Sequence, residues 1–174
     1  MTIYSLAGGC FWCLDAVYRR IKGVTSVVSG YAGGHTDNPT YEAVSTGSTG
    51  HAEVVQITFD ETIIPKDVIL DIFFLIHDPT TVNRQGADVG TQYRSAMYYT
   101  TDSDKEAFEA AIKRAQTHWD DPIVTELAPL TVFYAAESYH QDYFTNNPEA
   151  GYCSIVIAPK IIKARSVYFD RFLV

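Results

Sequence analysis

The sequence predicts an α+β fold: a two-layer sandwich with a ferredoxin-like β-α-β-β-α-β core and an irregular C-terminal extension. Strand-like and helix-like hydrophobic patterns alternate in that order through the first hundred residues, and the pattern weakens beyond residue 136. Hydrophobic residues make up 47% of the chain and charged residues 20%, which is typical of a protein with a packed core. The 174 residues contain no repeat, low-complexity tract or linker, so we expect a single domain over residues 1–174.

The core elements follow from the spacing of apolar residues. An apolar stripe with helical spacing follows Cys10, and another follows Pro65, so both segments are predicted helices. Four segments of alternating or continuous apolar character are predicted strands: residues 3–7, 24–31, 52–59 and 93–100. Two long loops, around residues 30–51 and 80–92, separate these elements, and loops of this length commonly carry function.

The elements after the core are less regular. Ser103 and Glu106 have the spacing of a capping box, which predicts the start of a third helix. The remaining predicted elements are short strands near residues 123–124 and 130–134, a helical stretch at 137–144, an extended stretch at 155–157 and a last amphipathic stretch up to residue 172.

The charge and cysteine content restrict the possible partners and compartment. The net charge of −8 argues against nucleic acid or an anionic membrane as a partner, because both require a basic face. The sequence has no apolar run of about 18 residues and no signal peptide or lipidation motif. Three cysteines without a secretory leader indicate a reducing compartment, so we expect a cytoplasmic protein, acting as a monomer, with catalytic rather than structural thiols.

Cys10 is the first candidate for chemistry. It lies where the first predicted strand turns into the first helix, and Gly8 and Gly9 let the backbone make that turn. The unpaired N–H groups and the dipole at a helix start favour a negative charge. We therefore expect a lowered pKa and a raised reactivity for the Cys10 thiol.

The residues next to Cys10 allow several interpretations. Cys10 could be a small buried hydrophobe, and its spacing to Cys13 also fits a thioredoxin-like redox pair or half of a zinc site. Zinc requires a second pair of ligands, and only Cys153 and scattered histidines are available, so we expect no metal site. Phe11 and Trp12 would form an apolar slot that fits a small group such as a methyl, or they are simply core residues.

Glu53 is the second informative residue. On the predicted strand its side chain points the same way as Val55 and Ile57, toward the apolar face. Burial penalises an ionised carboxylate, so the pKa of Glu53 should rise and the group could act as a proton donor near neutral pH. The alternative is that Glu53, at the start of its strand, reaches solvent.

The predicted topology brings scattered residues to one edge of the sheet. The end of the first strand, the loop between the second and third strands, and the start of the fourth strand share this edge. Cys10, Tyr41, Glu53, Asp88 and Tyr93 should therefore converge there, although each tyrosine or aspartate alone is more commonly a packing or loop residue.

Two thiols compete to react with an oxidised Cys10. Cys153 lies in a segment flanked by glycine and proline, where a mobile thiol could condense with a sulfenic acid on Cys10 to form a disulfide. Cys13 competes for this reaction because residues three apart are neighbours on a helix.

Seven motifs in chain order resemble the A-type peptide-methionine sulfoxide reductase family. They are residues 9–13 (GCFWC), 30–34 (GYAGG), 39–41 (PTY), 50–53 (GHAE), 77–80 (HDPT), 84–86 (RQG) and 90–95 (GTQYRS). The similarity extends from about residue 5 to residue 160. Two departures concern the thiols: many members have Gly at the position of Cys13, and some carry two C-terminal cysteines where this chain has only Cys153.

The resemblance implies a reaction and roles for these residues. Cys10 would attack the sulfur of a methionine S-sulfoxide, protein-bound or free, and Glu53 would protonate the departing oxygen. Tyr41 and Tyr93 would hydrogen-bond that oxygen, and Asp88 would lie in the substrate-orienting loop.

The resemblance also implies a methyl pocket and a recycling route. Phe11 and Trp12 would hold the methyl group of the substrate. Cys153 is the favoured resolving thiol, Cys13 is an alternative or relay thiol, and thioredoxin would reduce the resulting disulfide. The family requires no metal or organic cofactor. The competing functions are a general thiol-disulfide oxidoreductase and a non-catalytic module that binds oxidised methionine.

Overall fold

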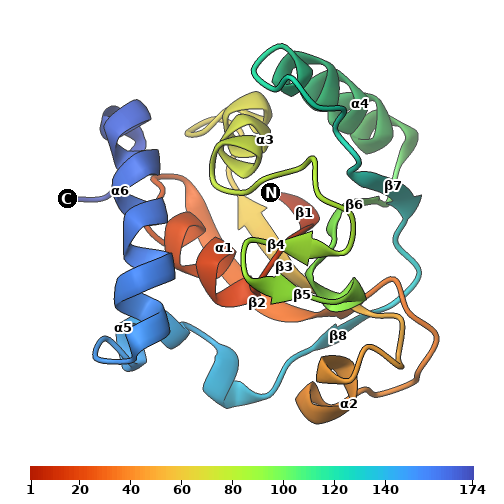
Figure 1. The fold of residues 1–174 in the computed structure, drawn as a ribbon. Helices are drawn as coiled ribbons and strands as arrows, with labels where there is room; N and C mark the ends of the chain where they lie inside the picture. The colour runs from red at the N-terminus through yellow and green to blue at the C-terminus, as the bar shows by residue number, and fades with distance from the viewer.

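Figure 1 shows the computed structural model, which describes residues 1–174. Its centre is a six-stranded sheet with the order β7-β6-β1-β3-β2-β8. The strands of this sheet are β1 (Thr2–Gly8), β2 (Val24–Ala32), β3 (Ala52–Phe59), β6 (Ser95–Tyr99), β7 (Glu126–Pro129) and β8 (Phe133–Ala135). Neighbouring strands are antiparallel except β6 and β7, which are parallel. The central order β6-β1-β3-β2 is that of a ferredoxin-like core, so the predicted topology is confirmed.

Six α-helices accompany the sheet. They are α1 (Phe11–Tyr18), α2 (Tyr41–Ser45), α3 (Lys66–Leu75), α4 (Asp102–Gln116), α5 (Tyr143–Asn146) and α6 (Ala158–Val167). In Figure 1 the blue helix α6 runs beside the red helix α1, and the two helices are in contact. The last part of the chain therefore packs directly on the helix that follows Cys10. None of the helices has the length and hydropathy needed to cross a lipid bilayer.

The two faces of the sheet carry different cores because side chains alternate along each strand. The larger cluster includes Leu6 and Val55 from the sheet, Leu14 from α1 and Phe73 from α3. The opposite face carries a smaller cluster of mainly small residues: Ala7, Ala32, Ala52, Val54, Ala96 and Tyr98. Glu53 has the same parity as Val55, so its carboxylate lies on the helix-covered face.

Both long loops contain short regular elements that the sequence pattern does not predict. Thr40 caps α2 in the first loop by accepting a hydrogen bond from the Ala43 N–H at 3.2 Å. The second loop contains the two-stranded hairpin β4 (Arg84–Gln85) and β5 (Asp88–Val89), followed by a 3-10 helix at Thr91–Tyr93. The predicted fourth strand therefore begins at Ser95, because the Tyr93 N–H closes a helical turn on the Gly90 carbonyl.

The predicted capping box is wrong by two residues. Thr101, rather than Ser103, is the N-cap of α4, and its hydroxyl accepts the Asp104 N–H at 3.1 Å. The predicted helix itself is confirmed, because the same apolar stripe, which includes Phe108 and Ala111, faces the core.

The C-terminal third differs most from the prediction. No strand forms at residues 123–124, and the stretch at 137–144 divides into a 3-10 helix at Ser138–His140 and α5, because Asp142 adopts a left-handed backbone conformation. The predicted extended stretch at 155–157 is wrong. It belongs to a π-helical turn at Cys153–Ile157 that continues into α6.

The reason for this error is the spacing of the buried residues. Cys153, Ile157 and Ile161 are four residues apart and all are buried in the main core. The β-branched residues between them favour a strand by propensity, and packing of this helical stripe overrides that preference.

The contact between β2 and β8 leads to a test of the fold. A Cβ at Gly30 would lie 2.4 Å from the Tyr134 carbonyl oxygen and 2.3 Å from Phe133 Cζ. We expect Gly30→Ala to displace β8 and to lower the free energy of unfolding by about 1–3 kcal/mol, the usual cost of overpacking. Urea unfolding followed by circular dichroism measures this loss. The matched control is Gly151→Ala, whose Cβ would meet nothing within 4 Å. Equal stability of the two variants would contradict the prediction.

Candidate active site

Cys10 lies at the junction of β1 and α1, as the sequence predicts. It is the N-cap of α1, and the preceding Gly9 has a φ of 91°. A Cβ at Gly9 would lie 2.6 Å from Cγ of Gln85, so glycine is required there by both conformation and space. Cys10 is only 8% exposed, so the thiol lies in a nearly closed site.

Glu53 lies on β3 and reaches the start of α1. Its Oε1 accepts the backbone N–H of Phe11 at 3.0 Å, and the residue is 1% exposed. Burial raises the pKa of the Glu53 carboxyl to about 8, although the Phe11 N–H acts in the opposite direction. The predicted rise in pKa is therefore confirmed, and the alternative that Glu53 reaches solvent is wrong.

The predicted fall in the pKa of Cys10 is wrong for the resting protein. Burial raises this pKa well above its usual value, and the hydrogen bond with the Cys13 thiol and the charge of Glu53 add to the rise. The backbone N–H of Trp12 lowers the pKa, as expected of a helix start, but this effect is smaller. Near neutral pH, Cys10 and Glu53 therefore both hold their protons.

The predicted edge residues come together around this pair. Tyr41 begins α2 and Tyr93 ends the 3-10 helix, and both are half-buried. Burial is the largest cause of a raised pKa for both phenols. The charges of Glu53 and Cys10 raise these pKa values further. Both tyrosines therefore remain protonated and offer O–H donors close to the thiol and the carboxyl.

Asp88 connects the hairpin to the C-terminal part of the chain. It lies on β5, and its Oδ2 accepts the Tyr152 O–H at 2.7 Å. The same Tyr152 oxygen lies 3.9 Å from Sγ of Cys13. Asp88 thus holds a phenol beside the second thiol of the site.

The two aromatic residues after Cys10 differ in their surroundings. Phe11 is fully buried in the main core, with its ring 5.7 Å from that of Tyr31. Trp12 is only partly buried, and its Nε1–H donates to Nδ1 of His140 at 3.0 Å. The Tyr143 ring stacks on Trp12 at 3.7 Å with an interplanar angle of 5°. Of the two rings, Trp12 is therefore the partly exposed one and Phe11 the buried one.

His140, Tyr143 and Tyr152 are site residues that the sequence analysis missed. His140 is one of the scattered histidines to which the sequence assigns no role, and the two tyrosines lie where the sequence pattern is least regular. Burial lowers the pKa of His140, so the ring is neutral, and its buried Nε2 has no hydrogen-bond partner. The only sequence signal for these residues was the density of aromatic residues between 139 and 152.

The three thiols are all free and buried. The Cys13 N–H donates to the Cys10 carbonyl at 3.1 Å, one helical turn along α1. The hydrogen bond with Cys10 lowers the pKa of Cys13, and the Lys160 ammonium acts in the same direction. Cys153 is fully buried, and its pKa is raised first by burial and then by the charge of Cys13. No three His, Cys, Asp or Glu side chains are arranged to hold a metal ion.

These groups define a class of enzyme. A thiol nucleophile beside a neutral carboxyl and two phenol donors is suited to thiol-dependent reduction, in which an oxygen must be protonated as it leaves. The two further thiols are suited to receiving the oxidation from Cys10. The site is therefore that of a thiol oxidoreductase.

Comparison with known proteins identifies the family. The family model described as "Peptide methionine sulfoxide reductase" matches residues 2–171. A peptide methionine sulfoxide reductase MsrA from Paenarthrobacter aurescens is 61% identical over 97% of each chain. The structure of reduced Mxr1 from Saccharomyces cerevisiae has a TM-score of 0.81 and 38% identity, covering 87% of this chain and 88% of that one. A structure of Mxr1 in complex with Trx2 has a TM-score of 0.57 and 27% identity, over 82% and 84% of the chains.

The chain therefore belongs to the peptide methionine sulfoxide reductase family, and it is an enzyme that reduces methionine sulfoxide. The resemblance found in the motifs is confirmed. The interpretations as a general disulfide oxidoreductase or a non-catalytic binding module are set aside.

The buried carboxyl makes stability depend on pH. Glu53 has a pKa of about 8 in the folded chain, against 4.5 when unperturbed. This raised pKa gives a contribution to stability that is complete below about pH 4.5 and is lost as the pH rises through about 8. We expect wild type to lose on the order of 3–5 kcal/mol over this range relative to Glu53→Gln, which cannot ionise. Urea unfolding of both proteins at pH 5, 7 and 9 measures the difference. Parallel curves would contradict a buried, neutral Glu53.

Proposed function

We propose that the chain, acting as one catalytic domain over residues 1–174, reduces the S-epimer of methionine sulfoxide, both free and within proteins. The observation that carries this proposal is the placement of a protonated Glu53 carboxyl against the start of the helix that Cys10 caps. Reduction of a sulfoxide needs a sulfur nucleophile and a proton for the departing oxygen, and this pair supplies both.

In the first step the Cys10 sulfur attacks the sulfoxide sulfur while Glu53 gives its proton to the sulfoxide oxygen. The resulting sulfur–sulfur bond and the sulfur–oxygen bond of the substrate then break while the hydroxyl transfers to the Cys10 sulfur, which releases methionine and leaves a sulfenic acid on Cys10. The proton lost by the Cys10 thiol restores the Glu53 carboxyl. Methionine sulfur is thus reduced by two electrons and Cys10 is oxidised by two, so no other reductant enters this step.

The surrounding side chains act on the oxygen and on the methyl group. Tyr41 and Tyr93 donate hydrogen bonds to the sulfoxide oxygen, which their raised phenol pKa values support. Trp12, supported by Phe11, holds the methyl group, and Asp88 orients the substrate through Tyr152.

The sulfenic acid is then resolved by the other two thiols. Cys13, which hydrogen-bonds Cys10, attacks the sulfenic acid, so that a Cys10–Cys13 disulfide forms and water leaves. Cys153 attacks Cys13 in a thiol-disulfide exchange that frees Cys10. Cys153 thus completes the resolution, because the external reductant attacks the disulfide that Cys153 forms with Cys13. Cys13 is the relay between Cys10 and Cys153.

Thioredoxin is the proposed reductant of the Cys13–Cys153 disulfide. The similarity to Mxr1, which has been solved in complex with Trx2, supports this choice. The enzyme would act as a monomer in the cytoplasm, where a reducing environment keeps all three thiols free between turnovers. None of these steps requires a metal or an organic cofactor.

Separated epimers test the proposed reaction. With dithiothreitol as reductant, we expect turnover of a peptide containing methionine S-sulfoxide and none of the R-epimer, measured by chromatography of the reduced peptide. Cys10→Ser should abolish turnover, because it removes the nucleophile. Turnover of the R-epimer, or activity that survives Cys10→Ser, would refute the proposed mechanism.

Thiol variants test the relay. When no reductant is present, wild type should release two methionines per chain, because the exchange frees Cys10 for a second attack. Cys13→Ser and Cys153→Ser should each release only one. With thioredoxin, Cys153→Ser should turn over at least about tenfold more slowly than wild type. Its Cys10–Cys13 disulfide cannot be exchanged for a Cys13–Cys153 disulfide, which is the one that thioredoxin reduces. After reaction with one equivalent of substrate, dimedone should label Cys10 in Cys13→Ser, where the sulfenic acid persists. It should not label wild type, where the sulfenic acid has been converted to a disulfide. Unchanged thioredoxin-dependent turnover in Cys153→Ser would exclude Cys153 as the resolving thiol.

A further inference from the structure

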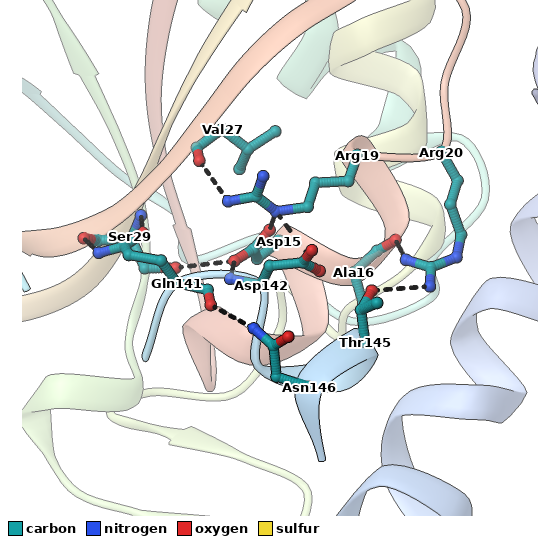
Figure 2. A network of polar contacts seen from close by, with 10 residues as sticks. All are labelled: Asp15, Ala16, Arg19, Arg20, Val27, Ser29, Gln141, Asp142, Thr145 and Asn146. Carbon is teal, nitrogen blue, oxygen red and sulfur yellow. Dashed lines mark hydrogen bonds and ion pairs between the residues drawn. The ribbon is translucent and has the colours of Figure 1, made fainter. Parts of the chain in front are cut away.

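Asp15 is a buried carboxylate that the proposed reaction does not use. It lies on α1, one helical turn after Trp12, and is 1% exposed. Figure 2 shows it at the centre of a polar network that joins α1, β2 and the segment leading into α5. The Arg19 guanidinium and the Ser29 hydroxyl, the latter at 3.4 Å, both donate hydrogen bonds to it. A third donor is the backbone N–H of Asp142, at 2.9 Å.

The Asp142 N–H belongs to a segment, residues 137–143, that we call the strap. Asp142 has a left-handed conformation, with φ 51° and ψ 44°, which directs the chain from the 3-10 helix into α5. The neighbouring Gln141 side chain accepts the Ser29 N–H at 2.8 Å and donates to the Ser29 carbonyl at 2.9 Å. The strap is therefore held on β2 by Gln141 and on α1 by Asp15 (Figure 2).

The strap carries the two side chains that hold Trp12. His140 accepts the indole N–H at 3.0 Å, and Tyr143 stacks on the indole face at 3.7 Å. Asp142 lies between these two residues in the chain. The helix α1 thus contacts the strap at two places one turn apart, through Asp15 and through Trp12.

The charge of Asp15 is balanced locally. Burial raises the pKa of Asp15, and the Arg19 cation opposes this rise. Arg19 also donates to the Val27 carbonyl at 2.7 Å, and its Nε lies 3.7 Å from Oδ1 of Asp142. Removing the Asp15 carboxylate would leave the Asp142 N–H without its acceptor and Arg19 without its closest anion.

We propose that Asp15 is a positioning residue for substrate recognition: it fixes the strap so that His140 and Tyr143 hold the Trp12 indole against the methyl group of the substrate. Asp15 touches no reacting atom, so its effect passes through the strap to Trp12. The proposal rests on the proposed function for its catalytic consequence, but the link from Asp15 to Trp12 is independent of it.

The test uses a Trp119→Phe background, in which Trp12 is the sole remaining tryptophan of the two. In this background we would compare Asp15→Ala, Asp15→Asn and Asp15→Glu with Asp71→Asn as a control. Asp71 also pairs with an arginine, Arg114 at 2.9 Å, but lies on α3 away from the strap. The readouts are acrylamide quenching of Trp12, and single-turnover reduction of methionine and ethionine S-sulfoxide peptides without reductant.

We expect Asp15→Ala to raise the half-saturating substrate concentration about tenfold, with the limiting rate changed less than about threefold, since chemistry at Cys10 is untouched. The preference for the methyl over the ethyl sulfoxide, on the order of tenfold or more in wild type, should fall to about two- to threefold. The Trp12 quenching constant should roughly double as the stacked ring loosens. Asp15→Asn should show a smaller change, Asp15→Glu should recover most of the wild-type behaviour, and Asp71→Asn should match the background.

Quenching and methyl preference that stay at background values in Asp15→Asn and Asp15→Ala would overturn the proposal, even if the melting temperature falls. If Asp15→Ala does not fold, Asp15→Asn decides alone. Its amide oxygen still accepts the Asp142 N–H, so the chain should fold, but the ion pair with Arg19 is lost and quenching and methyl preference should still shift in the stated direction. Failure of the background protein to reduce either sulfoxide would refute the proposed function instead, and quenching would still test the link to Trp12.

Discussion

The hydrogen bond from the Phe11 N–H to Glu53 is the contact on which the site depends. It joins the first N–H of α1 to the start of β3, two elements that are 42 residues apart in the chain. Because Cys10 immediately precedes Phe11, this bond fixes the distance between the thiol and the carboxyl. It also satisfies one of the donors that every helix start leaves unpaired. The central sheet order, with β3 beside β1, is what makes the contact possible.

Burial of this pair determines where the protons are before substrate arrives. A helix start alone would favour a Cys10 thiolate, but desolvation outweighs that effect and the nearby carboxyl opposes a second negative charge. The same desolvation keeps Glu53 protonated near neutral pH. Cys10 and Glu53 are therefore both uncharged at rest, and in the proposed reaction the thiol ionises as the Glu53 proton passes to the sulfoxide oxygen. A protected thiol of this kind is also less open to unwanted oxidation.

The sequence was sufficient for the core and for the main reacting groups because these depend on local patterns. Strand β3 begins and ends where alternation predicts, and Glu53 lies on the helix-covered face because it shares the parity of Val55. The pKa of Cys10 was wrong because burial is a property of the packed site and not of the helix start. The contact between Trp12 and His140 spans 128 residues, so no local pattern reveals it.

The two parts of the chain contribute different residues to the candidate site. The ferredoxin-like core provides Cys10, Glu53 and the two phenols, the groups to which the proposed mechanism assigns the breaking of the sulfur–oxygen bond. It does not provide the partners of Trp12, because His140 and Tyr143 belong to the extension after β8. An isolated indole at the edge of a sheet would sample several rotamers, and each would present a different surface to a methyl group. Selective recognition of so small a group requires a wall that does not move. In the proposed reaction, the C-terminal part of the chain therefore completes the methyl site by packing against the helix that Cys10 caps.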